Sequence, residues 1–341
     1  MSTPTSRILL LQLKRIGDTV LTSPAMAAVR AAYPAGELLL VVNGAPSDLA
    51  PAFEAVDEVW NYRPGRLNAG IWQRLVTGKF DGCLDFTGTD RSALMARLSG
   101  ARVRAGYRKF AEAKPLRRKA FTTLSDASVR ELHAVDFHLA LADALVGNLD
   151  RQVASSGFRV PDSVKVAAGL IDSDRFVLVH PGAARSEKYW PAERWAVVID
   201  HISTVHGQRC VVTGSNDPEE RSHVEEIGRR CVTGFVNLAE KLSLLELAKV
   251  IGQSTLALGV DSAAMHLAAM QGCHQIVLFG PTNPYHWRPR HENASVLLAG
   301  DNSLSVSEFE PRHQAAPMTD LSTEVACRAI DARLSAACPP S

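Results

Sequence analysis

Short, continuous apolar runs constrain the fold of this chain more than any other feature of its sequence. The first run, at 8–13, is followed by Gly17-Asp18-Thr19 and then by apolar residues at helical spacing up to Tyr33-Pro34. A strand that is apolar along its whole length is typical of a parallel sheet covered on both faces. Runs of the same kind predict further strands at 38–42, 58–62, 82–86, 176–180, 210–214, 256–260 and 275–280.

Segments with helical spacing lie between these runs. They predict helices near 19–33, 67–77, 90–99, 139–146, 191–207, 217–230, 243–252, 262–271 and 319–337. Strands that alternate with helices indicate a doubly wound parallel α/β sheet. A polar stretch at 148–174 divides the pattern into two halves, and the 341 residues are enough for about two domains of typical size. We therefore expect two such sheets in tandem, with a cleft between them and a boundary between residues 165 and 166.

The charge of the chain is balanced in total but unevenly distributed. Lys and Arg number 37 against 36 Asp and Glu, which by itself argues against a nucleic-acid or membrane-surface binder. Segment 91–130, however, holds 11 basic and two acidic residues, a net charge of +9. A solvated surface loop is one interpretation of such a run. RNA binding is disfavoured because neither a known module nor interleaved stacking aromatics accompany the charge.

Cysteine usage and hydropathy predict the compartment. The six cysteines form no CxxC pair and no cluster at zinc-ligand spacing, so we expect reduced thiols and no metal site. No signal peptide is visible, and no run of about 18 apolar residues could cross a bilayer as a helix. The sequence therefore predicts a soluble, cytoplasmic protein.

Small and polar residues follow the strands of the second half, at the sheet edge where ligands of open parallel sheets bind. They are PGAARSEK at 181–188, SNDP at 215–218, Asp261-Ser262 and PTN at 281–283. Small residues before a helix allow backbone N–H groups to approach an anion, and Lys188 adds a mobile charge. Each has a simpler interpretation: Asp261 or Ser262 as a helix cap, Lys188 as a solvated lysine, and His266 as a core residue. The standard phosphate motifs GxGxxG and GxxxxGK[ST] are absent, which disfavours a dehydrogenase or a P-loop NTPase.

Asp18 is the carboxylate that follows the first predicted strand. It could be the N-cap of a helix starting at Thr19, or it could act as a general base that deprotonates an acceptor hydroxyl. A lone carboxylate does not suit a glycosidase, which usually needs a pair.

Three segments together resemble a known family. RILLLQLKRIGDTVLTSPAMAAVRAAYP, HPGAARSEKYWPAERW, and LGVDSAAMHLAAMQG followed by FGPTNP are similar to segments of the ADP-heptose:lipopolysaccharide heptosyltransferases, glycosyltransferase family 9. The resemblance extends in order over about residues 7 to 290. It implies a GT-B fold of two Rossmann-like domains: an acceptor-binding domain at 1–165 and a nucleotide-sugar domain at 166–318. It also implies that the helix within 319–341 packs back on the first domain.

The implied reaction is metal-independent and uses no cofactor: heptose is transferred from ADP-heptose to the lipopolysaccharide core with inversion at the anomeric carbon. By position, Asp18 matches the family's catalytic base, and Lys188 matches the lysine that neutralises the departing diphosphate. Asp261 matches the acid that holds the heptose hydroxyls. The other implied donor-binding residues are Gly182, Ala183, Ser186, Asn216, Asp217, Ser262, Ala263 and His266. Ser262-Ala263 is a mild departure, since Thr or Ser followed by Gly is common in the family.

The resemblance also gives segment 91–130 a role, because this region lies beside the anionic acceptor in the family. The expected acceptor-binding residues are Arg104, Arg108, Lys109, Arg117, Arg118 and Lys119. An enzyme that uses such an acceptor would contact the inner face of the inner membrane peripherally. Two alternatives remain open: a sugar-nucleotide epimerase of the same architecture, and a nucleotide-sugar-binding module that has no catalytic activity.

Overall fold

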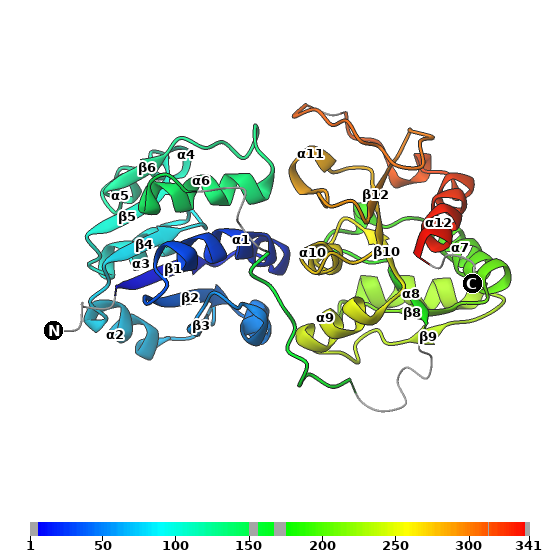
Figure 1. The fold of residues 1–341 in the computed structure, drawn as a ribbon, viewed down its shortest axis with the longest axis horizontal. Helices are drawn as coiled ribbons and strands as arrows, with labels where there is room; N and C mark the ends of the chain where they lie inside the picture. The colour runs from blue at the N-terminus through cyan, green and yellow to red at the C-terminus, as the bar shows by residue number, and fades with distance from the viewer. Residues whose placement is uncertain (1–5, 150–155, 167–174, 313, 338–341) are drawn as a thin grey trace. The chain divides into compact units, whose positions relative to one another are not determined.

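The computed structural model describes residues 6–149, 156–166, 175–312 and 314–337. Contacts divide the chain into two units, Met1–Pro161 and Asp162–Ser341 (Figure 1). This division lies four residues before the expected boundary. Of the expected connection at 148–174, residues 150–155 and 167–174 lie outside the described part of the chain.

The first unit contains a six-stranded, all-parallel sheet in the order β3-β2-β1-β4-β5-β6. Its strands are β1 (Arg7–Gln12), β2 (Glu37–Asn43), β3 (Glu58–Tyr62), β4 (Gly82–Asp85), β5 (Val103–Tyr107) and β6 (Thr123–Ser125). The central strand β1 is buried from Ile8 to Gln12, because sheet neighbours flank it and helices cover both faces. Leu9 and Leu11 point into a core shared with α2 and α3, as the two-residue period of a strand requires.

The helices of this unit are α1 (Ile16–Ala32), α2 (Ala69–Thr77), α3 (Asp90–Leu98), α4 (Arg108–Ala111), α5 (Pro115–Arg118) and α6 (Ala134–Val146). A 3₁₀ segment, Ala45–Ala52, follows β2. α1 and α6 lie side by side, as Figure 1 shows. α3 begins with a capping box, in which the Thr89 side chain accepts from the backbone N–H of Ser92 and the Ser92 side chain accepts from that of Thr89.

The second unit repeats this architecture with the order β12-β11-β10-β7-β8-β9. Its strands are β7 (Phe176–His180), β8 (Arg209–Val212), β9 (Val236–Asn237), β10 (Leu256–Val260), β11 (Gln275–Phe279) and β12 (Ala294–Leu298). Its helices are α7 (Ala192–His206), α8 (Pro218–Arg230), α9 (Leu244–Gln253), α10 (Ala263–Met270), α11 (Pro284–Trp287) and α12 (Thr323–Ala337). Trp190 and Trp195 are fully buried in the core between this sheet and α7, with their rings edge to face.

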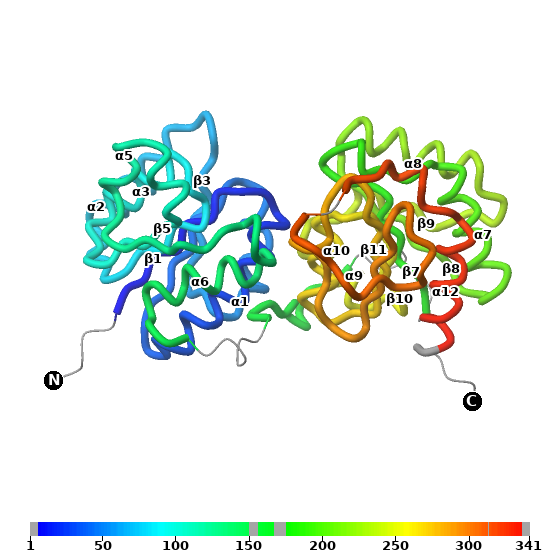
Figure 2. The backbone as a smooth tube through the Cα atoms, turned by 90° about the horizontal axis from the view of Figure 1, so that it is seen from above, coloured from blue at the N-terminus to red at the C-terminus, as the bar shows by residue number. Residues whose placement is uncertain are grey.

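The apolar side of α12 belongs to the core of the second unit. Val325, Ala329, Ile330 and Leu334 are buried in the same cluster as the α7 side chains, and α12 lies beside α7 (Figure 2). We expected this helix to pack on the first domain. The structure differs because the stripe of apolar residues on α12 covers the sheet and α7 of its own unit.

The predicted strands and helices are all present, whereas β5, β6, β9 and β12 were not predicted. Five cysteines lie in the described part of the chain, and all five are free thiols; Cys338 lies outside it. Within the described residues, no helix has the length and apolar character needed to cross a bilayer.

Candidate functional site

Each sheet has one point where the strand order reverses, and the loops that leave this point form the usual binding crevice of an open parallel sheet. In the second unit the reversal lies between β7 and β10, which pair directly. The loop after β7 carries Lys188, and the loop after β10 carries Asp261. Two predicted site residues that are 73 positions apart therefore belong to neighbouring loops.

Lys188 and Asp261 form a buried ion pair across these loops. The Nζ of Lys188 lies 2.6 Å from Asp261 Oδ2 and also donates to the Asp261 carbonyl oxygen at 3.0 Å. The Lys188 side chain is 15% exposed and the Asp261 side chain 5%. Thr282, from the loop after β11, donates its hydroxyl to the same Oδ2 at 2.8 Å. The interpretation of Lys188 as a solvated loop lysine is therefore wrong.

The start of α10 beside this pair lacks a side-chain cap. Ser262 occupies the N-cap position, yet its hydroxyl makes no capping hydrogen bond and is buried without a partner among the described residues. Asp261 is held by Lys188 instead, so neither residue has the capping role that spacing allowed. The first turn of a helix presents N–H groups and a positive dipole end. A buried hydroxyl beside uncapped N–H groups is suited to bind an anion.

The other residues predicted for this helix start are placed differently from one another. His266 is buried, and its Nε2 lies 3.7 Å from Asp261 Oδ1, so this histidine faces the ion pair rather than an apolar core. Ala263 is the first residue of α10 and is half-buried.

The loops after β7 and β8 form a second polar cluster that the sequence did not reveal. His180, the last residue of β7, contacts Thr213 Oγ1 through Nδ1 at 2.9 Å, and its Nε2 lies 3.6 Å from Glu220 Oε1. Glu220 is only 4% exposed, and within the part of the chain that the structure describes its Oε1 has no hydrogen-bond partner. Burial lowers the pKa of His180, and the charge of Glu220 opposes that shift.

Gly182 explains how Glu220 fits beneath this loop. A Cβ at position 182 would lie 2.3 Å from the Glu220 carboxyl group, so the backbone passes directly over this side chain. Sequence analysis missed Glu220 because it lies in the first turn of α8. A carboxylate in that position is usually solvated and interacts favourably with the helix dipole. The signal that could have identified it is the small residue Gly182 in the opposite loop.

The remaining predicted donor-binding residues lie outside this polar cluster. Asp217 is the N-cap of α8 and accepts from the N–H groups of Glu219 and Glu220 at 3.0 and 3.4 Å. Asn216 and Ser186 are exposed, and Ser186 begins a short 3₁₀ turn that ends at Lys188. Ala183 is buried within the loop after β7.

In the first unit, Asp18 is the third residue of α1 rather than a cap. The helix begins at Ile16 with Arg15 at the N-cap, three residues before the capping position that spacing allowed for Asp18. The Asp18 side chain is half-buried, and its carboxylate has no hydrogen-bond or ion-pair partner among the described residues. It lies in the first turn of α1, which follows β1, beside the point where the strand order reverses between β1 and β4.

A second carboxylate, Asp85, lies at the end of β4 on the other side of that point. It is fully buried and accepts from the N–H groups of Thr87 and Gly88 and from the Ser92 hydroxyl. Burial raises its pKa to about 6, although these hydrogen bonds oppose the shift. Sequence analysis did not identify Asp85, because it ends an otherwise apolar strand.

The basic segment 91–130 is partly neutralised by neighbouring carboxylates. Arg108 pairs with Asp126 and Glu112, and Arg117 pairs with Asp90. The Arg104 guanidinium donates to the carbonyls of Ala101 and Ala120, so it has a local structural role.

Three of the six predicted acceptor residues remain available to a ligand. Lys109, Arg118 and Lys119 are exposed and contact no carboxylate within the described residues. Beside them, Leu116 of α5 is 82% exposed.

Comparisons with known proteins agree with this architecture. The sequence model of glycosyltransferase family 9 (heptosyltransferase) matches residues 69–313. Lipopolysaccharide heptosyltransferase 3 of Escherichia coli is 26% identical over 299 residues, which cover 84% of this chain and 86% of the relative.

Two solved structures have the same fold. The glycosyltransferase family 9 protein of Veillonella parvula DSM 2008 superposes with a TM-score of 0.78 at 22% identity, over 98% of both chains. E. coli heptosyltransferase WaaC with ADP superposes with a TM-score of 0.71 at 19% identity, over 97% of this chain and 99% of that one.

These matches confirm the predicted α/β fold with two Rossmann-like sheets of the GT-B type. The family match covers more than half of the chain. The protein is therefore a glycosyltransferase, and it belongs to glycosyltransferase family 9, the heptosyltransferase family.

Proposed function

We propose that the protein transfers heptose from ADP-heptose to the inner core of lipopolysaccharide by a single inverting displacement. The observation that carries the proposal is the uncapped start of α10, where the buried Ser262 hydroxyl lacks a partner beside the Lys188–Asp261 ion pair. This arrangement suits a diphosphate, which needs N–H donors and a positive charge. The related E. coli proteins are a lipopolysaccharide heptosyltransferase and a heptosyltransferase with ADP.

In the proposed reaction, an acceptor hydroxyl oxygen attacks the anomeric carbon while the bond from that carbon to the diphosphate oxygen breaks. The hydroxyl proton passes to the carboxylate of Asp18. The negative charge that develops on ADP is neutralised by Lys188 and by the N-terminus of α10. A single displacement inverts the anomeric configuration, and no step in this scheme requires a metal ion or a cofactor.

Asp18 suits the role of base because no other group competes for its carboxylate. It has no partner among the described residues, whereas Asp85 nearby accepts three hydrogen bonds in a fully buried position. A base must reach the proton that it abstracts, so a half-buried carboxylate is better placed than a fully buried one. Positioned proton transfer typically contributes 10²- to 10⁴-fold to the rate.

Lys188 would gain a second anionic partner during the reaction. In the structure its ammonium group is held by Asp261, and Asp261 is the residue proposed to bind the heptose hydroxyls. A diphosphate that enters beside the pair offers Lys188 a second anion. The pair thereby keeps the lysine oriented toward the place where charge develops, at no reorganisation cost.

The exposed cations Lys109, Arg118 and Lys119 are proposed to bind the anionic acceptor. Leu116, on the same short helix as Arg118, adds an exposed apolar side chain. Cations around an apolar residue suit a glycolipid at a bilayer surface, where headgroups are anionic and acyl chains lie beneath. We therefore propose peripheral contact with the inner face of the inner membrane.

The test is a donor screen followed by product analysis. ADP-, UDP- and GDP-sugars are compared by calorimetry, and the tightest donor is incubated with core oligosaccharide for mass spectrometry. We expect ADP-heptose to bind best and the acceptor to gain one heptose. Altered sugar released without acceptor would indicate an epimerase, and donor binding without any product would indicate a binding module; either would refute the proposal.

The Asp18→Asn variant tests the base. It should bind ADP-heptose as the wild type does and should lose transfer by a factor of about 10² to 10⁴. The matched control is Asp48→Asn, which removes an exposed carboxylate of the same unit outside the basic segment. Transfer by Asp18→Asn within tenfold of wild type would remove Asp18 from the mechanism.

A further inference from the structure

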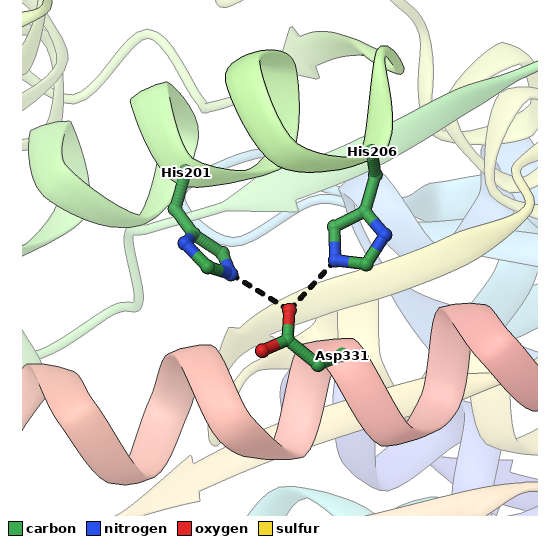
Figure 3. Close-up of side chains that lie close together, drawn as sticks. All are labelled: His201, His206 and Asp331. Carbon is green, nitrogen blue, oxygen red and sulfur yellow. Dashed lines mark hydrogen bonds and ion pairs between the residues drawn. The ribbon is translucent and has the colours of Figure 1, made fainter.

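Two histidines and one aspartate converge on the outer surface of the second unit, away from the residues used above. His201 and His206 lie on α7, and Asp331 lies on α12. Figure 3 shows both imidazole rings pointing down from α7 toward the single carboxylate that rises from α12. The Nε2 atoms of both rings lie 2.7 Å from the same oxygen, Asp331 Oδ1.

We propose that His201, His206 and Asp331 form a binding site for a divalent transition-metal ion. Two imidazoles and one carboxylate are a ligand set that suits Zn²⁺ and its first-row neighbours. One ligand atom from each residue lies within 4.8 Å of the other two. This site goes beyond the proposed transfer reaction and does not depend on it.

A metal ion could enter this cluster after a small movement of the three ligand atoms. Ligand atoms about 2.0–2.1 Å from a tetrahedral Zn²⁺ are roughly 3.3 Å apart, so the present 2.7 Å contacts would open by about 0.6 Å. The side chains are free enough to move, since His201 is 23%, His206 17% and Asp331 42% exposed. Each neutral ring would carry its proton on Nδ1 and give the Nε2 lone pair to the metal. Water from the exposed side would complete the coordination.

The local field also favours a cation. His206 is the last residue of α7, and Gly207 follows at the C-cap with a φ of 62°. The C-terminal end of a helix carries the negative end of its dipole and unpaired carbonyl groups, which stabilise positive charge. The carboxylate of Asp331 adds a negative charge at the same place, 2.7 Å from both imidazole Nε2 atoms.

A bound metal would join segments that are distant in the sequence. Asp331 is 130 residues from His201 and 125 from His206. The ion would therefore fasten the C-terminal helix α12 to α7, on which it already packs. Because such binding occurs only in the folded state, it adds to the stability of the unit in proportion to the metal concentration.

The test uses the full chain without a histidine tag, stripped with EDTA and then titrated with Co²⁺ and Zn²⁺. We expect one equivalent of Co²⁺ to bind with visible d–d absorption that Zn²⁺ abolishes. At a Zn²⁺ concentration about 100-fold above Kd, the Tm should rise by roughly 5–10 °C. Absence of both the absorption and the Tm shift would overturn the proposal.

Variants locate the site. His206→Gln and Asp331→Asn should each weaken Co²⁺ binding at least tenfold and remove the Tm shift, whereas His274→Gln, a histidine outside the cluster, should retain both. If Asp331→Asn fails to fold by circular dichroism, His201→Gln replaces it as the second cluster variant. Wild-type binding in both cluster variants would place the metal elsewhere and refute the assignment.

Discussion

The buried ion pair of the second unit makes a quantitative prediction for Lys188→Met. The substitution keeps the length of the side chain and removes the charge. It leaves the Asp261 carboxylate, only 5% exposed, with the Thr282 hydroxyl at 2.8 Å and the His266 ring at 3.7 Å. A buried charge that loses its partner typically destabilises a protein by about 3–5 kcal/mol.

This cost should appear in the unfolding of the second unit. For a domain of this size, each kcal/mol lowers the Tm by about 2–4 °C, so the expected loss is roughly 6–20 °C. The double variant Lys188→Met with Asp261→Asn should recover most of it, because the amide carries no charge. Lys241→Met, which removes an exposed lysine of the same unit, should change the Tm by no more than about 2 °C.

Differential scanning calorimetry measures these stabilities, and titration calorimetry measures ADP binding. We expect Lys188→Met to bind ADP about ten- to a hundred-fold more weakly, as the loss of a charged hydrogen bond predicts. A Tm within 2 °C of wild type, or a double variant as unstable as the single one, would refute the account of the ion pair. Unchanged ADP affinity would refute the donor role of Lys188 alone.

Three further predictions address other residues. Ser262→Ala should leave the unfolding free energy within about 0.5 kcal/mol of wild type, because the hydroxyl has no partner, but should weaken ADP binding about tenfold; an unchanged affinity in titration calorimetry would refute the anion site. Burial raises the pKa of Asp85 from 3.8 to about 6, so the folded state holds its proton more tightly and the unfolding free energy falls as pH rises through this range. Relative to Asp85→Asn, the wild type should therefore lose about 2.4 kcal/mol between pH 4 and pH 8 in urea denaturation, and a constant difference would contradict the shift. Higher salt should weaken acceptor binding more than ADP binding, and Arg118→Ser with Lys119→Ser should reduce that salt dependence; equal sensitivity of donor and acceptor would argue against the basic acceptor surface.

Much of the fold could be predicted because buried parallel strands have an unmistakable pattern. The run at 8–13 became β1, and the run at 256–260 became β10. Four strands, β5, β6, β9 and β12, were missed because their sequences lack such a run. β5, with the sequence VRAGY, contains Arg104, whose guanidinium donates to the backbone carbonyls of Ala120 and Ala101. β12 offers only a short apolar stretch, and its place beside β11 depends on tertiary contacts.

The candidate site, like the fold, could be predicted only in part. The order of strands and helices predicted that the loops of Lys188 and Asp261 share an edge, but not that the two side chains pair. That contact depends on the adjacency of β7 and β10, which no local pattern encodes. Glu220 was missed since its burial comes from the close passage of the Gly182 backbone. The predicted packing surface of α12 was wrong for a related reason. An apolar stripe shows that a helix is covered, but not by which surface.

The position of α12 also determines when each half of the protein can fold during synthesis. The first unit is complete by residue 161, so it can fold while the ribosome is still making the rest. The second unit needs Ile330 and Leu334 in its core, and these residues are synthesised after all the strands of its sheet. The sheet must therefore wait, with one apolar face uncovered, until α12 has left the ribosome. A nonsense mutation between β12 and α12 would leave that face exposed permanently and direct the product to proteolysis rather than to a shortened enzyme.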